Sequence, residues 1–257
     1  MDNGIRFTNS PKERQAAYNL RYQTYVKSMG RFNDNCDHAH QELKDQYDEN
    51  ARIVVAIKNN IAIGTLRVLW GNEVNFDQHL TQAYKISPFL NKLDPAKICI
   101  VERLMVDKSH RGSATMLRMF NEVMNFILTN KIELLLINAE AQHINSYIKL
   151  GCVPFTKQFL YPGIGPVTPM ALVVGDYQHL QSIGSPFSLL TTAEDTNYCQ
   201  HTWQLLSIIK EETTLTSMPS SMRAVLSIPT LPAANHPIYF RKSHPMNYRL
   251  KKRLATI

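Results

Sequence analysis

The chain has 257 residues, of which 44% are hydrophobic and 19% charged, and its formal net charge is +7. This composition is typical of a globular protein with one or two domains and excludes wholesale disorder. No apolar run approaches the roughly 20 residues that a membrane-spanning helix needs. The first residues lack the basic and apolar stretches of a secretory signal, and the four cysteines are far apart, so we expect a cytoplasmic protein with free thiols.

The first part of the chain predicts a helix, a loop and a hairpin. Residues 11–27 follow a Ser-Pro start signal and repeat apolar side chains at helical spacing, which predicts an amphipathic helix. Residues 28–51 are polar without a clear period and predict mostly loop. Two β-branched runs within residues 52–70 flank Asn59 and Asn60, which tolerate the positive φ of a tight hairpin turn.

Strands and helices then alternate. The elements expected next are one or two short helices (78–93), a long apolar strand (96–106), a helix (112–130), a buried strand (132–139), a short helix that stops at Gly151 (142–151) and two more strands (153–161 and 169–177). The helix 112–130 carries a buried stripe made of Met116, Leu117, Phe120, Val123, Met124 and Ile127. This order predicts a mixed α/β layer fold.

The sequence pattern changes near residue 190, beyond which one or two short helical segments are followed by a Pro-rich stretch. We therefore predict a main domain, 1–190, and a C-terminal extension, 191–257. The last 17 residues hold six basic side chains and no acid. Such a tail is either simply solvated or meets an acidic protein, anionic lipid or nucleic acid, and nucleic acid is not expected because no DNA-binding motif accompanies it.

The break between the long strand and the helix that follows it predicts an anion site. Lys108, His110 and Arg111 surround Gly112 there, and the start of a helix offers free backbone N–H groups. The stretch has neither GxGxxG nor the GK[ST] of a P-loop, which argues against a dinucleotide or a nucleoside triphosphate. Many turns of this kind bind nothing, so the break alone is weak evidence.

The same stretch, VDKSHRGSATMLRMF, resembles the acyl-donor loop of the GNAT (GCN5-related N-acyltransferase) superfamily, Gln/Arg-x-x-Gly-x-Gly/Ala. Gly112 and Ala114 match that pattern, whereas Ser109 stands where Gln or Arg is usual. The resemblance implies a GNAT-like mixed central sheet flanked by helices, here with a C-terminal extension. It also implies that acyl-CoA, or the acyl-phosphopantetheine of an acyl carrier protein, serves as co-substrate, with no permanently bound cofactor and no metal.

A second match lies downstream, where NSYIKLGCVPF resembles the Tyr-x-x-x-Gly-Phe pattern of the superfamily. Tyr147 and Gly151 match, and Cys152 replaces the usual Phe. The resemblance assigns donor binding to the following residues: Val106, Lys108, His110, Arg111, Gly112, Ser113 and Ala114. The cations of this loop suit an acidic acyl carrier protein, and they suit a coenzyme A phosphate equally well.

A narrower resemblance covers about residues 5–190. The segments LRYQTYV, DQYDENARIVVA, IGTLRVL and ERLMV, in this order, resemble acyl-homoserine-lactone synthases and, still more, long-chain N-acyl amino acid synthases. The matching residues, to which the resemblance assigns acceptor binding, are Arg21, Asp45, Asp48, Arg67 and Arg103. It implies an N-acyltransferase that moves an acyl group, a long one in these families, to the amine of an amino acid or a similar small molecule.

Physical chemistry gives the matching charges two compatible readings. Arg67 and Arg103 lie in strands that are otherwise apolar, and an unpaired buried charge costs several kcal/mol. Asp45 and Asp48 are three residues apart and share one face of a helical turn. We therefore expect one Arg/Asp cluster beside a cleft, which either shapes the loop as an ion-pair network or forms the wall that binds the acceptor.

Two residues are catalytic candidates for the attack of an amine on a thioester. Glu102 stands where a Ser is usual in the subgroup and is the nearest candidate base, because Arg103 should point to the other face of the strand. Tyr147 is either the acid that protonates the leaving thiolate or a core tyrosine. Backbone N–H groups of the split central strand would stabilise the oxyanion.

Two other functions stay open. The chain is also compatible with an N-acetyltransferase that uses acetyl-CoA, or with an inactive GNAT-fold binding module whose extension meets a partner, since Ser109 and Cys152 depart from the superfamily pattern. Cys36, His38 and His40 lie close together but have no fourth ligand at a standard spacing, so no metal site is expected.

Overall fold

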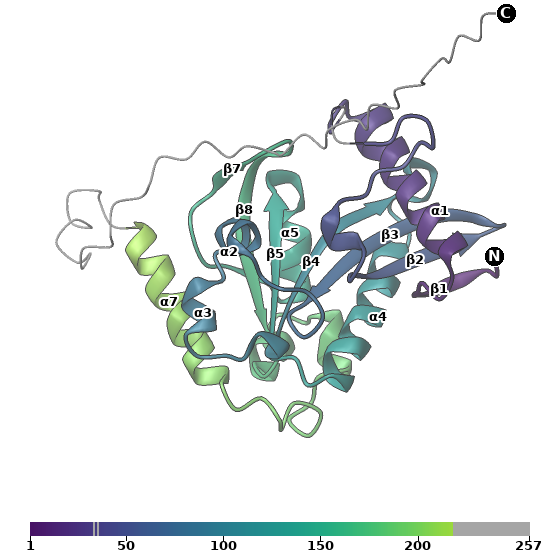
Figure 1. Ribbon diagram of the computed structural model, residues 1–257. Helices are drawn as coiled ribbons and strands as arrows, with labels where there is room; N and C mark the ends of the chain where they lie inside the picture. The colour runs from purple at the N-terminus through teal and green to yellow at the C-terminus, as the bar shows by residue number, and fades with distance from the viewer. Residues whose placement is uncertain (33, 35, 218–257) are drawn as a thin grey trace, which may run out of the picture. The chain divides into compact units, whose positions relative to one another are not determined.

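A computed structural model describes residues 1–32, 34 and 36–217 (Figure 1). The predicted Pro-rich stretch and the basic tail lie outside the described residues. Within them, no helix is long and apolar enough to cross a membrane. No group of three or more His, Cys, Asp or Glu side chains in this part of the chain could hold a metal ion.

The centre of the fold is an eight-stranded sheet with the order β1-β2-β3-β4-β5-β8-β6, in which β7 also pairs with β8. The strands are β1 (Gly4–Phe7), β2 (Arg52–Lys58), β3 (Ile61–Trp70), β4 (Ile98–Val106), β5 (Leu134–Glu140), β6 (Val153–Pro154), β7 (Phe159–Tyr161) and β8 (Gly165–Val173). All neighbours are antiparallel except β4 and β5. The predicted mixed sheet is confirmed, with β1 as an edge strand that the sequence did not predict.

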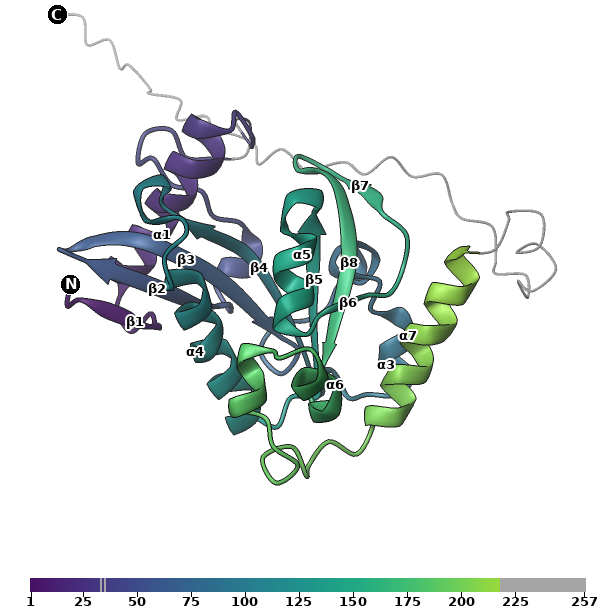
Figure 2. The same ribbon diagram turned by 180° about the vertical axis from the view of Figure 1, so that it is seen from behind.

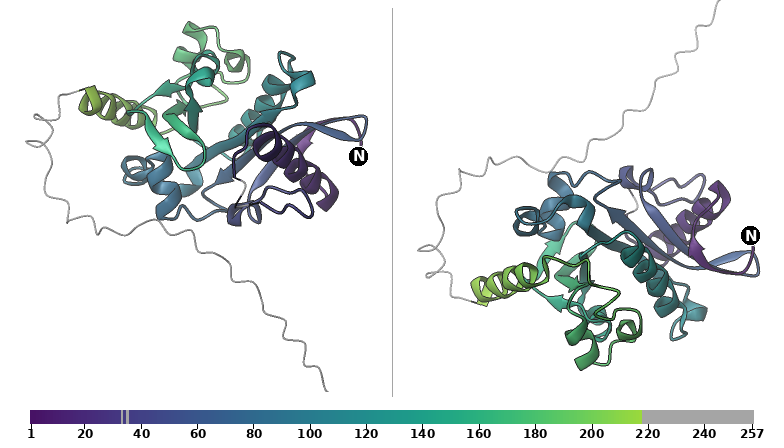
Figure 3. Two further views of the ribbon diagram at one scale, coloured as in Figure 1. Left: turned by 90° about the horizontal axis from the view of Figure 1, so that it is seen from above. Right: turned by 90° about the horizontal axis from the view of Figure 1, so that it is seen from below.

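Helices cover both faces of the sheet. They are α1 (Pro11–Arg21), α2 (Gln78–Tyr84), α3 (Ser87–Leu90), α4 (Thr115–Thr129), α5 (Ile144–Leu150), α6 (Tyr177–Ser182) and α7 (Thr202–Ser217), and a π-helical stretch, Tyr22–Ser28, continues α1. Figure 1 looks onto α1, α2, α3 and α7, and Figure 2 looks onto α4, α5 and α6 on the opposite face. Figure 3 shows the two helical layers along the edge of the sheet.

Several local predictions are confirmed by backbone conformation. Asn59 and Asn60 have φ values of 51° and 64° and join β2 to β3 in the predicted hairpin. Gly151 ends α5 with a φ of 110°, a conformation that glycine adopts without steric cost. Short-range chemistry therefore determined these turns.

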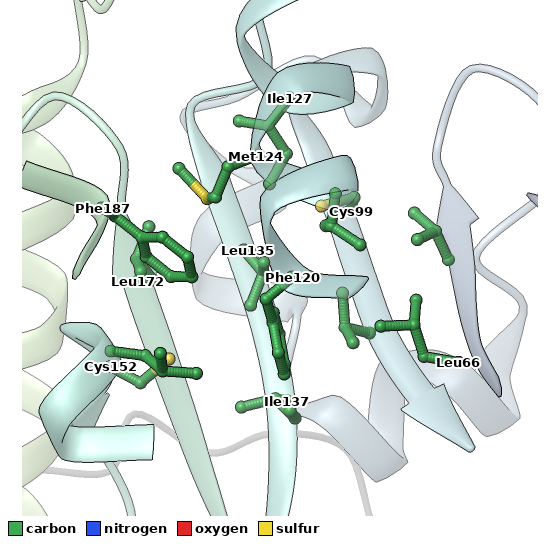
Figure 4. Close-up of a cluster of buried hydrophobic side chains, with 14 of the residues drawn as sticks. Leu66, Cys99, Phe120, Met124, Ile127, Leu135, Ile137, Cys152, Leu172 and Phe187 are labelled. Atoms are coloured by element: carbon green, nitrogen blue, oxygen red, sulfur yellow. The ribbon is translucent and has the colours of Figure 1, made fainter. Parts of the chain in front are cut away.

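The predicted stripe of the helix α4 forms much of the core. Phe120, Met124 and Ile127 are at most 1% exposed and pack in one cluster with side chains of β4, β5 and β8, such as Cys99 and Leu135 (Figure 4). Met116 and Leu117, at the start of the stripe, are only partly buried. Burial of this stripe fixes α4 against the sheet, and with it the loop that precedes the helix.

The two parallel strands β4 and β5 separate after a short contact. They pair only from Ile98 to Ile100 and from Leu134 to Leu136, so the later residues of β4 have no strand partner on that side within the described chain. On its other side, β4 contains a β-bulge opposite Leu66, where Arg103 has a φ of 54°. The divergence and the bulge together create the space for the site described below.

The helix α7 belongs to the predicted C-terminal extension. Its Leu205 and Ile209 are buried in a cluster that also contains Ile98 of β4 and Leu134 of β5. This packing shows that the chain just beyond residue 190 contributes to the hydrophobic core. The predicted boundary at residue 190 stays a prediction.

Candidate active site

The centre of the site is the guanidinium group of Arg67, whose side chain is 1% exposed. Its Nη1 lies 2.6 Å from Asp45 Oδ1 and 2.8 Å from Asp48 Oδ2. Its Nη2 lies 2.9 Å from Asp45 Oδ2 and 2.5 Å from Glu102 Oε1, and its Nε donates to the same Glu102 oxygen at 2.8 Å. One buried cation therefore holds three carboxylates.

Two more arginines complete a network that is neutral as a whole. Arg21 donates from Nη1 to Asp48 Oδ1 at 2.7 Å, and both side chains are almost fully buried. Arg103 donates from Nη2 to Asp45 Oδ2 at 2.9 Å. The members of this charge network are Arg21, Asp45, Asp48, Arg67, Glu102 and Arg103. The predicted Arg/Asp cluster is therefore confirmed as a spatial arrangement.

The turn that supplies the two aspartates is stabilised by its own side chains. Asp45 precedes a short 3₁₀ turn, Gln46–Asp48, and its side chain accepts from the backbone N–H of Tyr47 at 3.0 Å. The side chain of Asp48 accepts from the backbone N–H of Asp45 at 3.0 Å, which completes a capping box. The three-residue spacing thus aims both carboxylates at Arg67.

The predicted orientation of Arg103 was wrong. Strand alternation placed Arg103 and Glu102 on opposite faces, but both side chains reach the charge network, Glu102 through Arg67 and Arg103 through Asp45. The cause is the β-bulge, which inserts one extra residue and turns the side chain of Arg103. The guanidinium of Arg103 also lies over the ring of Phe32, 4.8 Å from its centroid.

Burial and ion pairing shift the pKa values of the two aspartates of the network in opposite directions. Burial raises the pKa of Asp48, but the charges of Arg21 and Arg67 outweigh it and leave that pKa below the usual value. The pKa of Asp45 is also well below its usual value, because Arg67 and Arg103 overcome the effect of burial. Both aspartates are therefore ionised in the folded protein at neutral pH.

A cavity of about 410 Å³ opens where β4 and β5 diverge. Its lining includes residues 101–106 of β4, His110, Arg111, Gly112 and Ser113 of the following loop, Met116 of α4, Ile137 and Asn138 of β5, and Tyr147 of α5. Glu102 and Arg103 are the members of the charge network that line it within the described chain. The other members, Arg21, Asp45, Asp48 and Arg67, are not among the lining residues.

Most residues of the predicted donor loop therefore line the cavity. Val106, His110, Arg111, Gly112 and Ser113 are among the lining residues, whereas Lys108 is exposed outside it. Ala114 is the N-cap residue of α4 and offers no side-chain cap, and the N–H of Thr115 donates to Ser113 Oγ at 3.3 Å. Capacity to bind an anion at this helix start therefore rests on the N–H groups that follow Thr115.

The backbone at Gly112 explains why a glycine stands in the loop. Its φ is 79°, in the left-handed region, and no described residue other than its two chain neighbours has an atom within 4 Å of the place where a Cβ would be. The position is therefore strained for most other residues but open to a ligand.

The two catalytic candidates lie in the same cavity. Both oxygens of Glu102 accept hydrogen bonds, Oε1 from Arg67 and Oε2 from the hydroxyl of Tyr84 at 2.7 Å. Tyr147 is 6% exposed, and burial raises the pKa of its hydroxyl, which therefore stays protonated and able to donate.

Sequence reasoning missed several residues of the site. Tyr84 and Tyr161 line the cavity, and Arg31 forms a two-pronged ion pair, at 3.0 and 2.8 Å, with Glu140 at the end of β5. Tyr84 ends a short helix with weak periodicity, and Arg31 lies in a polar stretch without a pattern. Neither position carries a local signal, because the partner of each is distant in the sequence.

A family model and several solved structures match this chain. Residues 16–173 match the family model described as N-acyl amino acid synthase FeeM. The structure resembles FeeM, an N-acyl amino acid synthase from uncultured soil microbes, with a TM-score of 0.53 and 19% identity over 73% of this chain and 98% of that chain. No curated protein sequence matches the chain.

Two further solved structures share the fold. One is BjaI, a CoA-dependent acyl-homoserine lactone synthase, with a TM-score of 0.54 and 16% identity over 71% of this chain and 91% of that chain. The other is MesI, also a CoA-dependent acyl-homoserine lactone synthase, with a TM-score of 0.52 and 17% identity over 70% of this chain and 95% of that chain. The GNAT-like fold that the sequence predicted is confirmed.

The lowered pKa of Asp48 predicts how stability depends on pH. The unfolded chain binds a proton at Asp48 at a higher pH than the folded protein, so this contribution is complete above the unfolded pKa of about 4 and is lost as the pH falls below it. In Asp48→Asn the slope of unfolding free energy against pH between 4 and 2 should be shallower, by up to about 1.4 kcal/mol per pH unit.

Urea unfolding at several pH values measures this slope. Glu49→Gln is the matched control, since Glu49 is the neighbouring carboxylate and is exposed, and it should leave the slope unchanged. Equal slopes in the wild type and Asp48→Asn would contradict the prediction.

Proposed function

This chain belongs to the N-acyl amino acid synthase FeeM family and is an N-acyltransferase, and we propose that it transfers a long acyl chain to the amine of an amino acid. The single observation that carries this proposal is the continuity of one cavity. The donor loop forms part of its wall at Gly112, and Glu102 and Arg103 bring the charge network to the same space. A thioester and an amine bound in one such space are close enough to react.

The donor in this proposal is the acyl-phosphopantetheine of an acyl carrier protein or an acyl-CoA. The pantetheine arm lies against Val106 and residues 110–114, with its phosphate at the start of α4. Lys108, Arg111 and Arg118 are exposed around this loop and give it a positive surface. An acidic carrier protein is attracted to such a surface over a longer range than a single small ligand is.

The acceptor lies beside Glu102 and Arg103. The Nη1 of Arg103 is buried and has no hydrogen-bond partner among the described residues, although Nη2 is paired with Asp45. A carboxylate of the acceptor would satisfy this donor, which favours an amino acid over a simple amine. In this proposal Arg21, Asp45, Asp48 and Arg67 act on the acceptor through Glu102 and Arg103, which they hold in place.

The reaction needs one proton removed and one supplied. The amine nitrogen attacks the thioester carbonyl carbon, and Glu102 accepts the proton of that nitrogen directly or through a water molecule. Backbone N–H groups of β4 beyond the contact with β5, which have no strand partner on that side among the described residues, stabilise the oxyanion. The C–S bond then breaks, and Tyr147 donates its proton to the leaving thiolate.

The donor assignment predicts the effect of a charge at Gly112. Gly112→Asp should weaken the binding of acyl-CoA by at least about tenfold, because a carboxylate would stand where the donor phosphate binds. Gly112→Asn is the matched control, since its side chain has the same size and the same backbone demand without the charge. Isothermal titration of both variants measures the difference. Equal affinities for the two variants, or wild-type affinity in Gly112→Asp, would contradict the assignment.

The proposed donor also predicts a response to salt. Long-chain acyl carrier protein should have a higher kcat/KM than acetyl-CoA, and this value should fall steeply as salt is added, because screening acts over about 8 Å at physiological ionic strength. Thiol release from the two donors, measured at several salt concentrations with a panel of amino acids, provides the test. If acetyl-CoA is the better donor and its rate is at least as sensitive to salt, the chain is a general acetyltransferase.

Charge-reversal variants test which surface residues attract the acyl carrier protein. Arg111→Glu combined with Arg118→Glu should reduce kcat/KM for the carrier protein more than for acyl-CoA. Lys92→Glu combined with Lys210→Glu changes the net charge equally at exposed positions that do not line the cavity, and it should have little effect. Equal losses in the two double variants would mean that only the net charge matters.

A further inference from the structure

The orientation of Glu102 depends on a tyrosine from another part of the chain. Its Oε1 is held by Arg67 and its Oε2 accepts the hydroxyl of Tyr84 at 2.7 Å. We propose that Tyr84 is a positioning residue for acyl transfer, which fixes the carboxylate plane of Glu102 so that its remaining lone pair, on Oε2, faces the acceptor amine. This inference rests on the proposed role of Glu102 as the base.

The hydrogen bond from Tyr84 holds the second oxygen of Glu102, which Arg67 does not contact. Arg67 contacts Glu102 only at Oε1, through two hydrogen bonds, so the carboxylate can still pivot about that oxygen when the side-chain bonds of Glu102 rotate. The hydrogen bond from Tyr84 holds Oε2 and prevents that movement. Burial and the charge of Glu102 raise the pKa of Tyr84 well above its usual value, so the hydroxyl remains a donor across the pH range of catalysis.

The helix that carries Tyr84 is attached at both ends to the charged site. At its start, Asp77 caps α2 by accepting from the N–H of Leu80 at 2.9 Å, and it also accepts the hydroxyl of Tyr47 at 2.7 Å. Tyr47 lies in the turn between Asp45 and Asp48. The helix α2 thus spans from the aspartate turn to Glu102, and its last residue is Tyr84.

Packing alone does not account for the hydroxyl of Tyr84. The ring is 3% exposed in an apolar cluster with Ile86 and Phe89, where a phenylalanine would fill the same space. A buried hydroxyl costs free energy unless it is hydrogen bonded, and here it bonds the candidate base in the wall of the cavity. The hydroxyl of Tyr84 therefore contributes to the site through its hydrogen bond to Glu102, and not to the packing of the cluster.

Other ionisable groups also act on Glu102, so a pH experiment has to separate them. The charged and titratable side chains around it are Arg67 from β3, Asp45 from the 3₁₀ turn, Arg103 from β4, Tyr84 from α2, Tyr161 from β7 and Tyr25 from the π-helical stretch. Substitution of Tyr84 by Phe removes one hydroxyl and leaves all the others in place.

Steady-state kinetics of Tyr84→Phe test the proposal with the donor and acceptor that the wild type uses. We expect kcat to fall roughly 10- to 100-fold, as for the loss of one hydrogen bond to a charged group, while KM for the donor stays within about twofold. The acid limb of the pH profile should move to higher pH, because a carboxylate that loses a donor takes up a proton more readily. Wild-type kcat with an unmoved profile would overturn the proposal.

Tyr47→Phe distinguishes the positioning of Glu102 by Tyr84 from a general effect of anchoring the helix α2. This variant removes the hydroxyl at the other end of the helix and makes no change at Glu102, so it should lower the melting temperature and leave the acid limb in place. If Tyr47→Phe and Tyr84→Phe lower kcat alike and neither moves the acid limb, the role is only structural and the proposal fails. Absence of acyl transfer in the wild type would instead refute the proposed function.

A second substitution tests the proposal if Tyr84→Phe does not fold. Incorporation of 3-fluorotyrosine at position 84 keeps the ring and hydroxyl but makes the hydroxyl more acidic, and hence a stronger donor. The acid limb should then move to lower pH, opposite to the change in Tyr84→Phe. A movement in the same direction in both proteins, or no movement with fluorotyrosine, would overturn the role of the hydrogen bond.

Discussion

One buried cation, Arg67, links three parts of the chain that are far apart in the sequence. It joins the aspartate turn at Asp45 and Asp48 to Glu102 of the neighbouring strand. A guanidinium and three carboxylates cannot be buried separately without a large desolvation cost, so the turn, β3 and β4 must come together as a unit. The network is neutral because Arg21 and Arg103 supply the two remaining positive charges.

The second constraint is the irregular path of β4. Its β-bulge turns Arg103 into the charge network, and its early divergence from β5 leaves backbone groups and a cavity open between the strands. A regular strand would have placed Glu102 and Arg103 on opposite faces and closed the space with hydrogen bonds. The same short stretch therefore provides the candidate base and the proposed acceptor contact, and it leads into the proposed donor loop at Gly112.

Local sequence patterns predicted much of the fold. The requirement that buried charges be paired predicted part of the site. The Asn59-Asn60 hairpin and the end of α5 at Gly151 follow from turn chemistry within a few residues. The clustering of the charges follows from the cost of burying them unpaired. Contacts that depend on tertiary structure were not predictable, such as the bulge at Arg103 and the hydrogen bond from Tyr84, whose position in a short helix carries no sign of a partner on β4.

The claim that Arg67 holds the carboxylates together is tested most directly by a double-mutant cycle with Asp48, measured by urea unfolding at pH 7. Arg67→Met should cost about 3–5 kcal/mol of unfolding free energy in the wild-type background, since it leaves buried charges uncompensated. In an Asp48→Asn background the same change should cost less, with a coupling of roughly 0.5–3 kcal/mol. An equal cost in both backgrounds would contradict the account, because Asp48 would then not depend on Arg67.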